Sequence, residues 1–503
     1  MRDAFLAIDV GTQSSRAAVL TLDGQVLAIA SHPHTMATPR PGWAEQNPAD
    51  WWDATLRNVR DVVSETTDQV RVRAVAVCGQ MHGAVPVARD GALLATAVQL
   101  WCDKRAARIA TEVDARPDRD ALLRLTGNVP APAWSGFKMA WMKREQPELY
   151  NRAWKILTPK DFINLRLTGA AATDRSEASG SFLMDSRDGT WSTELIELLD
   201  LEAGHLPPIH TSSDVIGTVL PEVARETGLQ AGTPVVAGSG DMLALLLGAG
   251  VTVPGVACDT SGTASIISFY AKQPVADCRL MNLHAAGPHW ISFGILDSGG
   301  GGLRWWRDQF IAGVGDDGDA VYERMMADAA GVPVGSEGLL FLPYLLGERT
   351  LGSADSRGVF FGLHPRHGRA HATRAILEGI CLDLRQSLEI ARESGLAITE
   401  MRTGGGGARS ELWSQIKTDV YGIPVSTLRH EEAGILGAAM LAGVGVEAYA
   451  SEADASRRLV QTRERFTPDQ HASARYDQQY TLFHDLHDRL QPSFQRAADL
   501  ASS

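Results

Sequence analysis

The chain has 503 residues, of which 44% are hydrophobic, and its formal charge at pH 7 is −13. Single hydrophobic cores stop growing at about 250–300 residues, so this length predicts two large domains. The acidic excess excludes a basic surface for nucleic acid, but it permits a nucleotide ligand that backbone N–H groups and a divalent cation bind.

The beginning of the chain predicts a three-stranded antiparallel meander. Residues 5–10, 15–20 and 26–29 are short apolar runs, and Asp-Gly between the last two is typical of a hairpin turn. The first run ends on Asp9, just before a glycine turn. Asp9 has two interpretations: it is a plain turn residue, or it holds Mg²⁺, often through water.

A buried strand is predicted over residues 72–79, after a helix that is predicted over residues 49–65. Gln80, Met81 and His82 come directly after this strand and lie between two glycines. A lone histidine is more often structural. A polar–apolar–polar trio at a strand tip nevertheless favours a site for a small polar ligand, which needs a few fixed donors and an apolar wall.

The middle of the chain, residues 103–220, is predicted to consist mainly of helices and loops. It leads to a buried strand over residues 235–237, a glycine turn, Asp241 and an apolar helix. Asp241 is a preferred residue for a helix N-cap. It can also take a hydroxyl proton during phosphoryl transfer, and the two roles are compatible, although Asp with an ordinary pKa of about 3.9 is a weak base.

Residues 256–270 repeat the pattern of the first strands. "AIDVGTQSSRAAVL" and "ACDTSGTASIISF" both run from an apolar strand through Asp and a small-residue turn into a second apolar strand. A pattern repeated at this distance predicts two domains of related build.

The last third predicts a glycine loop and helices. Gly404–Gly407 precede a helix whose apolar residues recur at helical spacing, and a short strand is expected over residues 423–425. Residues 431–441 predict a helix of small residues that permits close backbone packing. After residue 450 the chain is charged and predicts a peripheral helical layer.

Three glycine turns at strand ends or helix starts, at Gly11, Gly262 and Gly404–Gly407, together indicate phosphate binding. Phosphates need backbone N–H donors at close range, and glycine lets the chain approach. None of the three matches a P-loop, and none has the strand–GxGxxG–helix form of a dinucleotide site.

These motifs resemble the FGGY family of carbohydrate kinases, over nearly the whole chain. The resemblance rests on their order and spacing: "AIDVGTQSSRAAV", "GWAEQNPADWW", "CGQMHGAV", "LTPKDFINLRLTG", "SGDMLALLLGAG", "SGTAS", "FLPYLLGERT", "RGVFFGL", "TGGGGARSELWSQIKTDVYGIPV" and "EEAGILGAAMLAG". Within the family the chain is most similar to the branch that acts on D-xylulose.

The resemblance implies an α/β fold of two ribonuclease-H-like domains, as in actin and Hsp70 ATPases, flanking a deep cleft. It implies an N-terminal domain over residues 1–247, a C-terminal domain over residues 248–450, and a helical extension over residues 451–503 packed on the C-terminal domain. The N-terminal domain would bind the sugar and carry the first phosphate loop and the base. The C-terminal domain would carry the second phosphate loop and bind adenosine.

The resemblance also implies roles for individual residues, with ATP and Mg²⁺ as cofactors. Asp241 matches the catalytic base, and Asp9 matches the acid near Mg²⁺ and substrate. Gln80, Met81 and His82, with Asp9 and Asp241, would contact the sugar. The nucleotide-binding residues would be Gly11, Thr12 and Gln13 in the first phosphate loop, Gly262 and Thr263 in the second, and Gly406, Gly407 and Ser410 in the adenosine loop.

The implied reaction is ATP-dependent phosphorylation of a terminal hydroxyl of a ketopentose, with D-xylulose to D-xylulose 5-phosphate as the first expectation. The D-xylulose branch usually has Asn after the catalytic Asp, whereas this chain has Met242. Another small ketose or polyol, such as ribulose, L-xylulose or a sugar alcohol, therefore stays open. Two further alternatives are a chaperone-like or filament-forming ATPase on the same fold and a sugar sensor without catalysis.

We expect a cytoplasmic protein without nucleic-acid or membrane partners. The five cysteines are scattered and form no CxxC pair, which is typical of reduced thiols, and the first residues lack a long apolar segment. Members of the family are often dimers, so a homodimer is one expected state.

Overall fold

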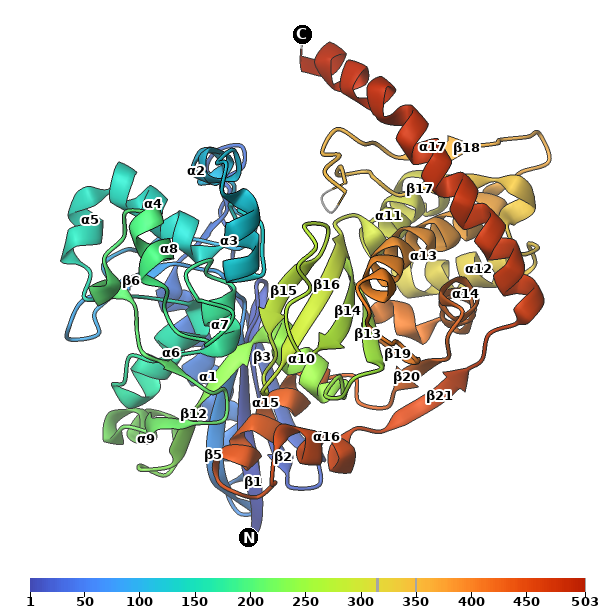
Figure 1. Ribbon diagram of the computed structural model, residues 1–503. Coiled ribbons are helices and arrows are strands. Elements are labelled where there is room, and N and C mark those ends of the chain that lie inside the picture. Colours follow the sequence, from blue (N-terminus) through green and yellow to red (C-terminus); the bar gives the residue numbers. More distant parts are fainter. Residues whose placement is uncertain (314–315, 349–350, 503) are drawn as a thin grey trace.

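The computed structural model describes residues 1–313, 316–348 and 351–502. Two mixed β-sheets organise the chain (Figure 1). The first has the strand order β11-β12-β5-β1-β2-β3. Its strands are β1 (Arg2–Val10), β2 (Ser14–Thr21), β3 (Val26–Pro33), β5 (Val70–Gly79), β11 (Val215–Thr218) and β12 (Pro234–Gly240). The predicted meander is confirmed as β1–β2–β3, and β5 and β12 continue the sheet parallel to β1.

The second sheet has the order β15-β16-β14-β13-β19-β20-β21. Its strands are β13 (Val256–Ser261), β14 (Ser265–Ala271), β15 (Met281–His284), β16 (Trp290–Leu296), β19 (Glu400–Gly404), β20 (Val425–Leu428) and β21 (Thr462–Phe466). Here β13, β14 and β16 form the antiparallel meander, and β19 and β20 run parallel to β13. Both sheets thus share one core topology, and the prediction of two domains of related build is confirmed.

Helices cover both sheets and fill the space beside them. In the first half these are α1 (Pro48–Thr66), α2 (Ala107–Asp114), α3 (Arg119–Thr126), α4 (Ser135–Glu145), α5 (Pro147–Arg152), α6 (Pro159–Thr168), α7 (Arg175–Ser179), α8 (Thr193–Leu198) and α9 (Pro221–Thr227). In the second half they are α10 (Asp241–Gly248), α11 (Gly299–Trp306), α12 (Gly318–Ala330), α13 (Arg369–Glu393), α14 (Glu411–Tyr421), α15 (Ala433–Gly445), α16 (Glu452–Leu459) and α17 (Gln470–Ser502). Short strand pairs join β4 (Glu45–Gln46) to β7 (Val98–Gln99), β6 (Val85–Val87) to β8 (Lys155–Leu157), β9 (Thr173–Asp174) to β10 (Ile209–His210), and β17 (Leu340–Leu342) to β18 (Val359–Phe361).

Helices α10 and α15 cross each other at the junction of the two halves. Helix α15 also packs on β1, β5 and β12 of the first sheet, although it lies far along the chain. The crossing is close because glycines face backbone: a Cβ at Gly248 would lie 1.9 Å from the carbonyl oxygen of Ala433, and one at Gly437 would lie 1.9 Å from that of Ala244. The predicted close packing of a small-residue helix is confirmed, and its partner is α10.

Three predictions about elements need correction. The region after residue 450 is not purely helical, because β21 pairs with β20 and extends the second sheet. The strand expected over residues 423–425 is β20, which begins at Val425. Asp241 is the first residue of α10 rather than its N-cap, which is Gly240. The end of the "FLPYLLGERT" motif, residues 349–350, lies outside the described residues.

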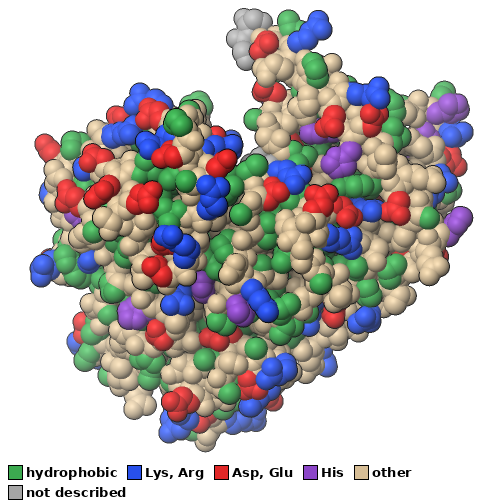
Figure 2. All heavy atoms as spheres, in the orientation of Figure 1, with side chains coloured by type: hydrophobic (Ala, Val, Ile, Leu, Met, Phe, Trp, Pro, Cys, Tyr) green, Lys and Arg blue, Asp and Glu red, His purple; other side chains and the backbone are tan. Residues whose placement is uncertain are grey.

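The space-filling view shows the molecule hollowed at its top, between the lobe of α2–α5 and the lobe of α11–α13 (Figure 2). Within the described ranges, the structure contains no helix that is both long and apolar enough to span a membrane.

Candidate functional site

Two carboxylates meet at one edge of the first sheet. Asp9 lies near the end of β1 and pairs with Cys78 of β5, while Gly240 at the end of β12 pairs with Gly79. Because β1, β5 and β12 are parallel neighbours, their carboxyl ends lie together, and Asp241 follows directly after β12. The thiol of Cys78 lies near both acids, and burial together with the charges of Asp9 and Asp241 raises its pKa well above the usual value.

A bulge before Asp241 determines how β12 ends. The register of β12 against β5 shifts between Val236 and Ser239. Gly238 lies in this shift with φ +73°, and a Cβ there would lie 1.8 Å from the carbonyl oxygen of Val77. Only glycine fits so close to a neighbouring backbone at positive φ. The glycines of "GSGD" therefore shape the strand end that presents Asp241.

Both carboxyl groups have raised pKa values, and burial is the main cause for each. Burial raises the pKa of Asp9 to about 6, which Arg16 opposes and Glu432 supports. Burial, and then the charge of Asp9, raises the pKa of Asp241 to about 7. The expectation of an ordinary pKa for Asp241 is therefore wrong, because the sequence does not show that a second acid lies beside it. A carboxyl group with this pKa is a far better general base near neutral pH.

Hydrogen bonds from neighbouring segments hold the predicted first phosphate loop, residues 11–13, in place. The Thr12 hydroxyl donates to Gln80 Oε1 at 3.3 Å, and the Gln46 amide donates to the Thr12 carbonyl at 2.6 Å. Gly11 N–H closes the turn on the Ser14 carbonyl at 3.1 Å, while Gln13 is exposed. Gln80 is buried, and its amide donates to Gln46 at 2.9 Å. Gln80 therefore links the tip of β5 to this loop.

Met81 and His82 follow the end of β5, whose last residue, Gly79, pairs with Gly240 just before Asp241. Met81 is buried against Gly240, where a Cβ would come within 2.5 Å of its sulfur. His82 has φ +66°, its Nδ1 lies 2.9 Å from the Gly180 carbonyl, and its ring meets Trp134 edge-on at 5.1 Å. Burial, and then the charge of Lys138, lowers the pKa of His82 to about 3. The ring is neutral, so Nδ1 donates to the carbonyl and Nε2 is an acceptor.

Trp101 is a candidate site residue that the sequence reasoning missed. Its indole N–H donates to the Thr12 hydroxyl at 3.2 Å, and 38% of its surface is exposed, although it is a large aromatic residue. An exposed aromatic ring beside a phosphate loop suits the apolar face of a sugar. The only sequence signal is a tryptophan at the end of an apolar run.

On the second domain, the predicted second phosphate loop and the predicted adenosine loop line one cavity of about 720 Å³. The predicted residues Gly262, Thr263, Gly406, Gly407 and Ser410 all line it. Ser410 also caps α14, because its hydroxyl accepts the Trp413 N–H at 3.2 Å. The structure therefore brings together all five residues that were predicted for nucleotide binding in this half.

The start of α11 adds a glycine run that the sequence reasoning did not use. Gly300 lines the same cavity, and Gly301 N–H donates to the Thr263 carbonyl at 2.9 Å. Free N–H groups at a helix start favour anions, so the run "GGGG" at residues 299–302 was the available signal.

Asp259, at the end of β13, has the place in the second sheet that Asp9 has in the first. It is fully buried and paired with Lys417 Nζ at 2.8 Å, and it accepts the Tyr421 hydroxyl at 2.7 Å. Lys417 also donates to Ser261 and Thr403, so it ties the two nucleotide loops together. Asp9 Oδ1, in contrast, is buried without a hydrogen-bond partner in the described part of the chain.

Known proteins match this architecture along most of the chain. The models of the N-terminal and C-terminal domains of the FGGY family of carbohydrate kinases match residues 4–248 and 256–446. The chain therefore belongs to the FGGY carbohydrate kinases, and the prediction of two ribonuclease-H-like domains with an actin-like fold is confirmed.

Individual relatives span the full length. The chain is 32% identical to the xylulose kinase of Escherichia coli K12, over 97% of this chain and 99% of that one. It is 27% identical to the gluconokinase of Bacillus subtilis, over 99% and 98%. The crystal structure of xylulose kinase from Rhodospirillum rubrum superposes with a TM-score of 0.90 at 31% identity and covers 98% of this chain and 100% of that one. The enzyme is thus a carbohydrate kinase that is similar to xylulose kinases.

Proposed function

We propose that this kinase transfers the γ-phosphoryl group of ATP to a terminal hydroxyl of a ketopentose, with D-xylulose as the preferred substrate and D-xylulose 5-phosphate as the product. The observation that carries the proposal is the pair of carboxylates Asp9 and Asp241 at the edge of the first sheet, where residues 80–82 follow β5. The relatives named xylulose kinase support the choice of sugar.

In this mechanism each lobe has its own task. Residues 1–247 bind the sugar and carry the base, while residues 248–450 bind the nucleotide in the cavity between Gly262 and Ser410. The sugar lies against Met81 and Trp101, and His82 Nε2 accepts a hydrogen bond from a sugar hydroxyl. Gln80 supports the first phosphate loop by accepting the hydrogen bond from the Thr12 hydroxyl. Thr12, Gln13 and the N–H groups of the first loop approach the phosphates from the opposite side.

Asp241 accepts the proton of the attacking hydroxyl. Because phosphoryl transfer has a loose transition state, the carboxylate mainly has to orient the hydroxyl in line with the γ-phosphorus and take its proton late. The pKa of about 7 lets Asp241 do this near neutral pH. Closure of the lobes would keep water away from the phosphoryl group.

Asp9 fits a magnesium ion. Its Oδ1 is buried and without a partner among the described residues, and kinases hold Mg²⁺ with one or two carboxylates, water and phosphate oxygens. When bound, Mg²⁺ neutralises charge on the β- and γ-phosphate oxygens. Asp9 would hold it, directly or through water.

The decisive test of the base is Asp241→Asn. We expect turnover to fall by about 10²–10⁴-fold while the affinity for nucleotide stays unchanged, because the base acts only on the sugar hydroxyl. Coupled measurement of ADP release gives turnover, and calorimetry gives nucleotide binding. Near-normal sugar phosphorylation by the variant would overturn the assignment.

A panel of acceptors tests the sugar. We expect D-xylulose to have the highest kcat/KM among D-xylulose, D-ribulose, L-xylulose, sugar alcohols and D-gluconate, the last included because a gluconokinase is among the relatives. A higher value for any other acceptor would replace D-xylulose. ATP turnover that does not depend on any added sugar would instead favour the alternative of an ATPase with another role.

A further inference from the structure

The short helix α7 lies between the proposed base, the sugar-binding histidine and the second domain. Asp174 caps its start by accepting the Ser176 N–H at 2.9 Å, and the residues Ser176, Glu177 and Ser179 are all buried. An isolated helix of this length has no stability of its own, so tertiary contacts hold it in place. Three of those contacts lead to functional parts of the molecule.

The first contact leads to the base. The N–H of Gly240 donates to the Ser176 hydroxyl at 2.9 Å. Gly240 immediately precedes Asp241 and is the N-cap of α10. The hydrogen bond therefore fixes the Ser239–Gly240 peptide, one unit before the peptide that carries Asp241.

The second contact leads to the sugar side. The carbonyl of Gly180, which ends α7, accepts the hydrogen bond from His82 Nδ1 at 2.9 Å. A Cβ at Gly180 would lie 2.6 Å from the His82 ring, so the approach is possible only for glycine. This one bond determines that Nε2 is the nitrogen left for a ligand.

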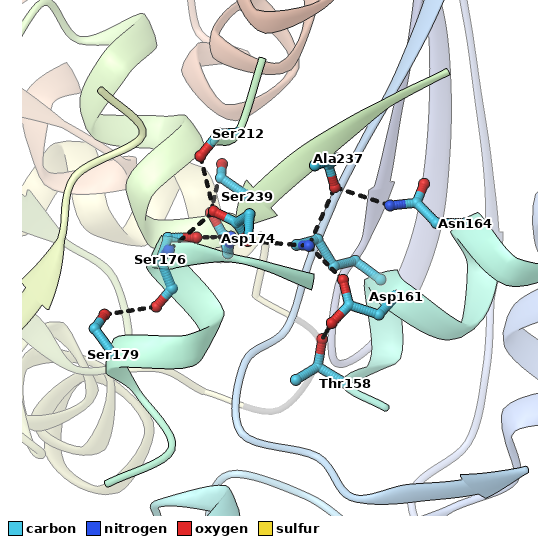
Figure 3. Close-up of polar contacts among 11 residues, drawn as sticks. Thr158, Asp161, Asn164, Asp174, Ser176, Ser179, Ser212, Ala237 and Ser239 are labelled. Atoms are coloured by element: carbon cyan, nitrogen blue, oxygen red, sulfur yellow. Dashed lines mark hydrogen bonds and ion pairs between the residues drawn. The ribbon is translucent and has the colours of Figure 1, made fainter. Parts of the chain in front are cut away.

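The third contact crosses to the second domain. The N–H of His284 in β15 donates to the Ser179 hydroxyl at 2.8 Å. The same hydroxyl donates to the Ser176 carbonyl at 2.8 Å, as Figure 3 shows. Nearby, the side chain of Asn128 accepts the Asn282 N–H and donates to its carbonyl, both at 2.8 Å. The edge strand of the second sheet is thus hydrogen-bonded to the segment that holds the base.

A buried ion-pair cluster anchors the start of α7 (Figure 3). Lys160 is fully buried, lies 3.0 Å from Asp174 Oδ1, pairs with Asp161, and donates to the Ala237 carbonyl at 3.1 Å. The Ser212 hydroxyl donates to Asp174 at 2.7 Å. The cluster therefore joins α7 to β12, just before the bulge at Gly238.

Helix α7 is not arranged for stability alone. Both carboxyl oxygens of Glu177 are buried and have no hydrogen-bond partner in the described ranges. Glu177 and Asp161 line a cavity of about 20 Å³, which is large enough for one water molecule. Burying a polar group without partners costs free energy, so a segment that keeps one here has another requirement to meet.

We propose that α7 is a positioning element for the phosphoryl transfer: Ser176 orients the backbone just before Asp241, Gly180 orients His82, and Ser179 couples both to the second domain. This inference rests on the proposed function of Asp241. Movement of β15 during closure of the lobes would reach Asp241 and His82 through Ser179 and the backbone of α7.

The first test compares Ser176→Ala with Ser181→Ala. Ser181 is a matched control, because it is also buried and close in sequence, but among the described residues its hydroxyl bonds only to the Ala178 carbonyl and the Leu183 N–H. We expect kcat of Ser176→Ala to fall by about 10- to 100-fold, because small misplacements of reacting groups have effects of this size. The KM for ATP and the melting temperature should match those of Ser181→Ala.

The second test uses Ser179→Ala, which removes the link to β15. We expect the ratio of sugar-stimulated to sugar-independent ATP hydrolysis to fall in Ser179→Ala and to stay at the wild-type value in Ser181→Ala. Ser176 and Ser179 belong to one chain of hydrogen bonds, so the double variant should lose less activity than the two single losses combined. A merely structural role would lower stability without changing this ratio.

The outcomes separate the two proposals when Asp241→Asn is measured in parallel. If Asp241→Asn is inactive but Ser176→Ala turns over at the rate of Ser181→Ala, the positioning role is wrong and the base assignment stands. Fully additive losses in the double variant would also contradict the coupling. If Asp241→Asn remains active, the base assignment fails and the inference about α7 fails with it.

Discussion

At the scale of single residues, two aspartates at equivalent strand ends have opposite environments. Asp259 is neutralised by Lys417 and hydrogen-bonded to Tyr421 and Ser261, whereas Asp9 has a free buried oxygen among the described residues and lies near Asp241. A buried charge with a partner is structural, and one without a partner is available for a ligand. The duplicated architecture thus contains one acid, Asp259, that holds loops together, and one acid, Asp9, that is available to bind a ligand.

The raised pKa of Asp241 makes a prediction about stability. Its value of about 7 in the folded state lies above that of an unfolded chain, so the stabilising contribution is present below about pH 4 and is lost as pH rises through about 7. Asp241→Asn removes the charged form, and water screens the partly exposed carboxylate, so at pH 8 the variant should be more stable than the wild type by about 2 kcal/mol. Chemical denaturation at pH 8 and pH 4 measures the difference.

The control for this measurement is Asp68→Asn, which changes an exposed aspartate of the same domain. The stability difference for Asp241→Asn should shrink towards zero at pH 4. An equal gain in the free energy of unfolding at both pH values, or no gain at pH 8, would show that the charged carboxylate of Asp241 does not destabilise the folded state.

Met242 directly follows Asp241, the proposed base, and is partly buried against the core that both domains share. If D-xylulose is the native substrate and Met242 is merely tolerated, Met242→Asn should keep the order of preference in the sugar panel. The kcat/KM values for each sugar provide the measurement. A reversed order would mean that Met242 selects the substrate.

At the scale of elements, the crossing of α10 and α15 depends on two glycines. We expect Gly437→Ala to destabilise the protein by about 1–3 kcal/mol or more, because its Cβ would collide with backbone that cannot rotate away. Gly434→Ala on the same helix is the matched control, since its Cβ meets nothing within 4 Å. That variant should gain up to about 1 kcal/mol from helix propensity. Thermal unfolding of both variants tests the pair, and equal effects would contradict the close crossing.

The sequence predicted elements well where local pattern decides them. The β1–β2–β3 meander follows from alternating apolar runs and from Asp23-Gly24, whose glycine has φ +83°. Strand β21 was missed because "TRERF" is almost entirely polar and its residues are mostly exposed, so only pairing with β20 makes it a strand. Trp101 was not predicted for a similar reason: its place beside the first loop depends on its contact with Thr12, which is far away in the chain.

At the scale of the whole molecule, the proposed site needs both lobes. The first lobe carries Asp9, Asp241 and His82, and the second carries the cavity with Gly262 and Gly406. Ligands that contact both lobes bind the closed form better and shift the population towards it.

We therefore expect small-angle X-ray scattering to show a smaller radius of gyration when sugar, Mg²⁺ and a non-hydrolysable ATP analogue are all present. Sugar alone or nucleotide alone should give a smaller change, because each contacts mainly one lobe. Identical scattering curves with and without the full set would contradict closure.

The sequence by itself determined the two strand–turn–strand units, their order with the glycine loops, and thus the family and the candidate residues. These features are local: a few consecutive side chains are enough to define a strand, a turn or a phosphate loop. Only the tertiary structure decided which acid is free, because Asp259 is neutralised by a lysine 158 residues away and Asp9 is not. It also decided the pKa of Asp241 and the place of α7, since burial and neighbouring charge arise only when distant segments pack together.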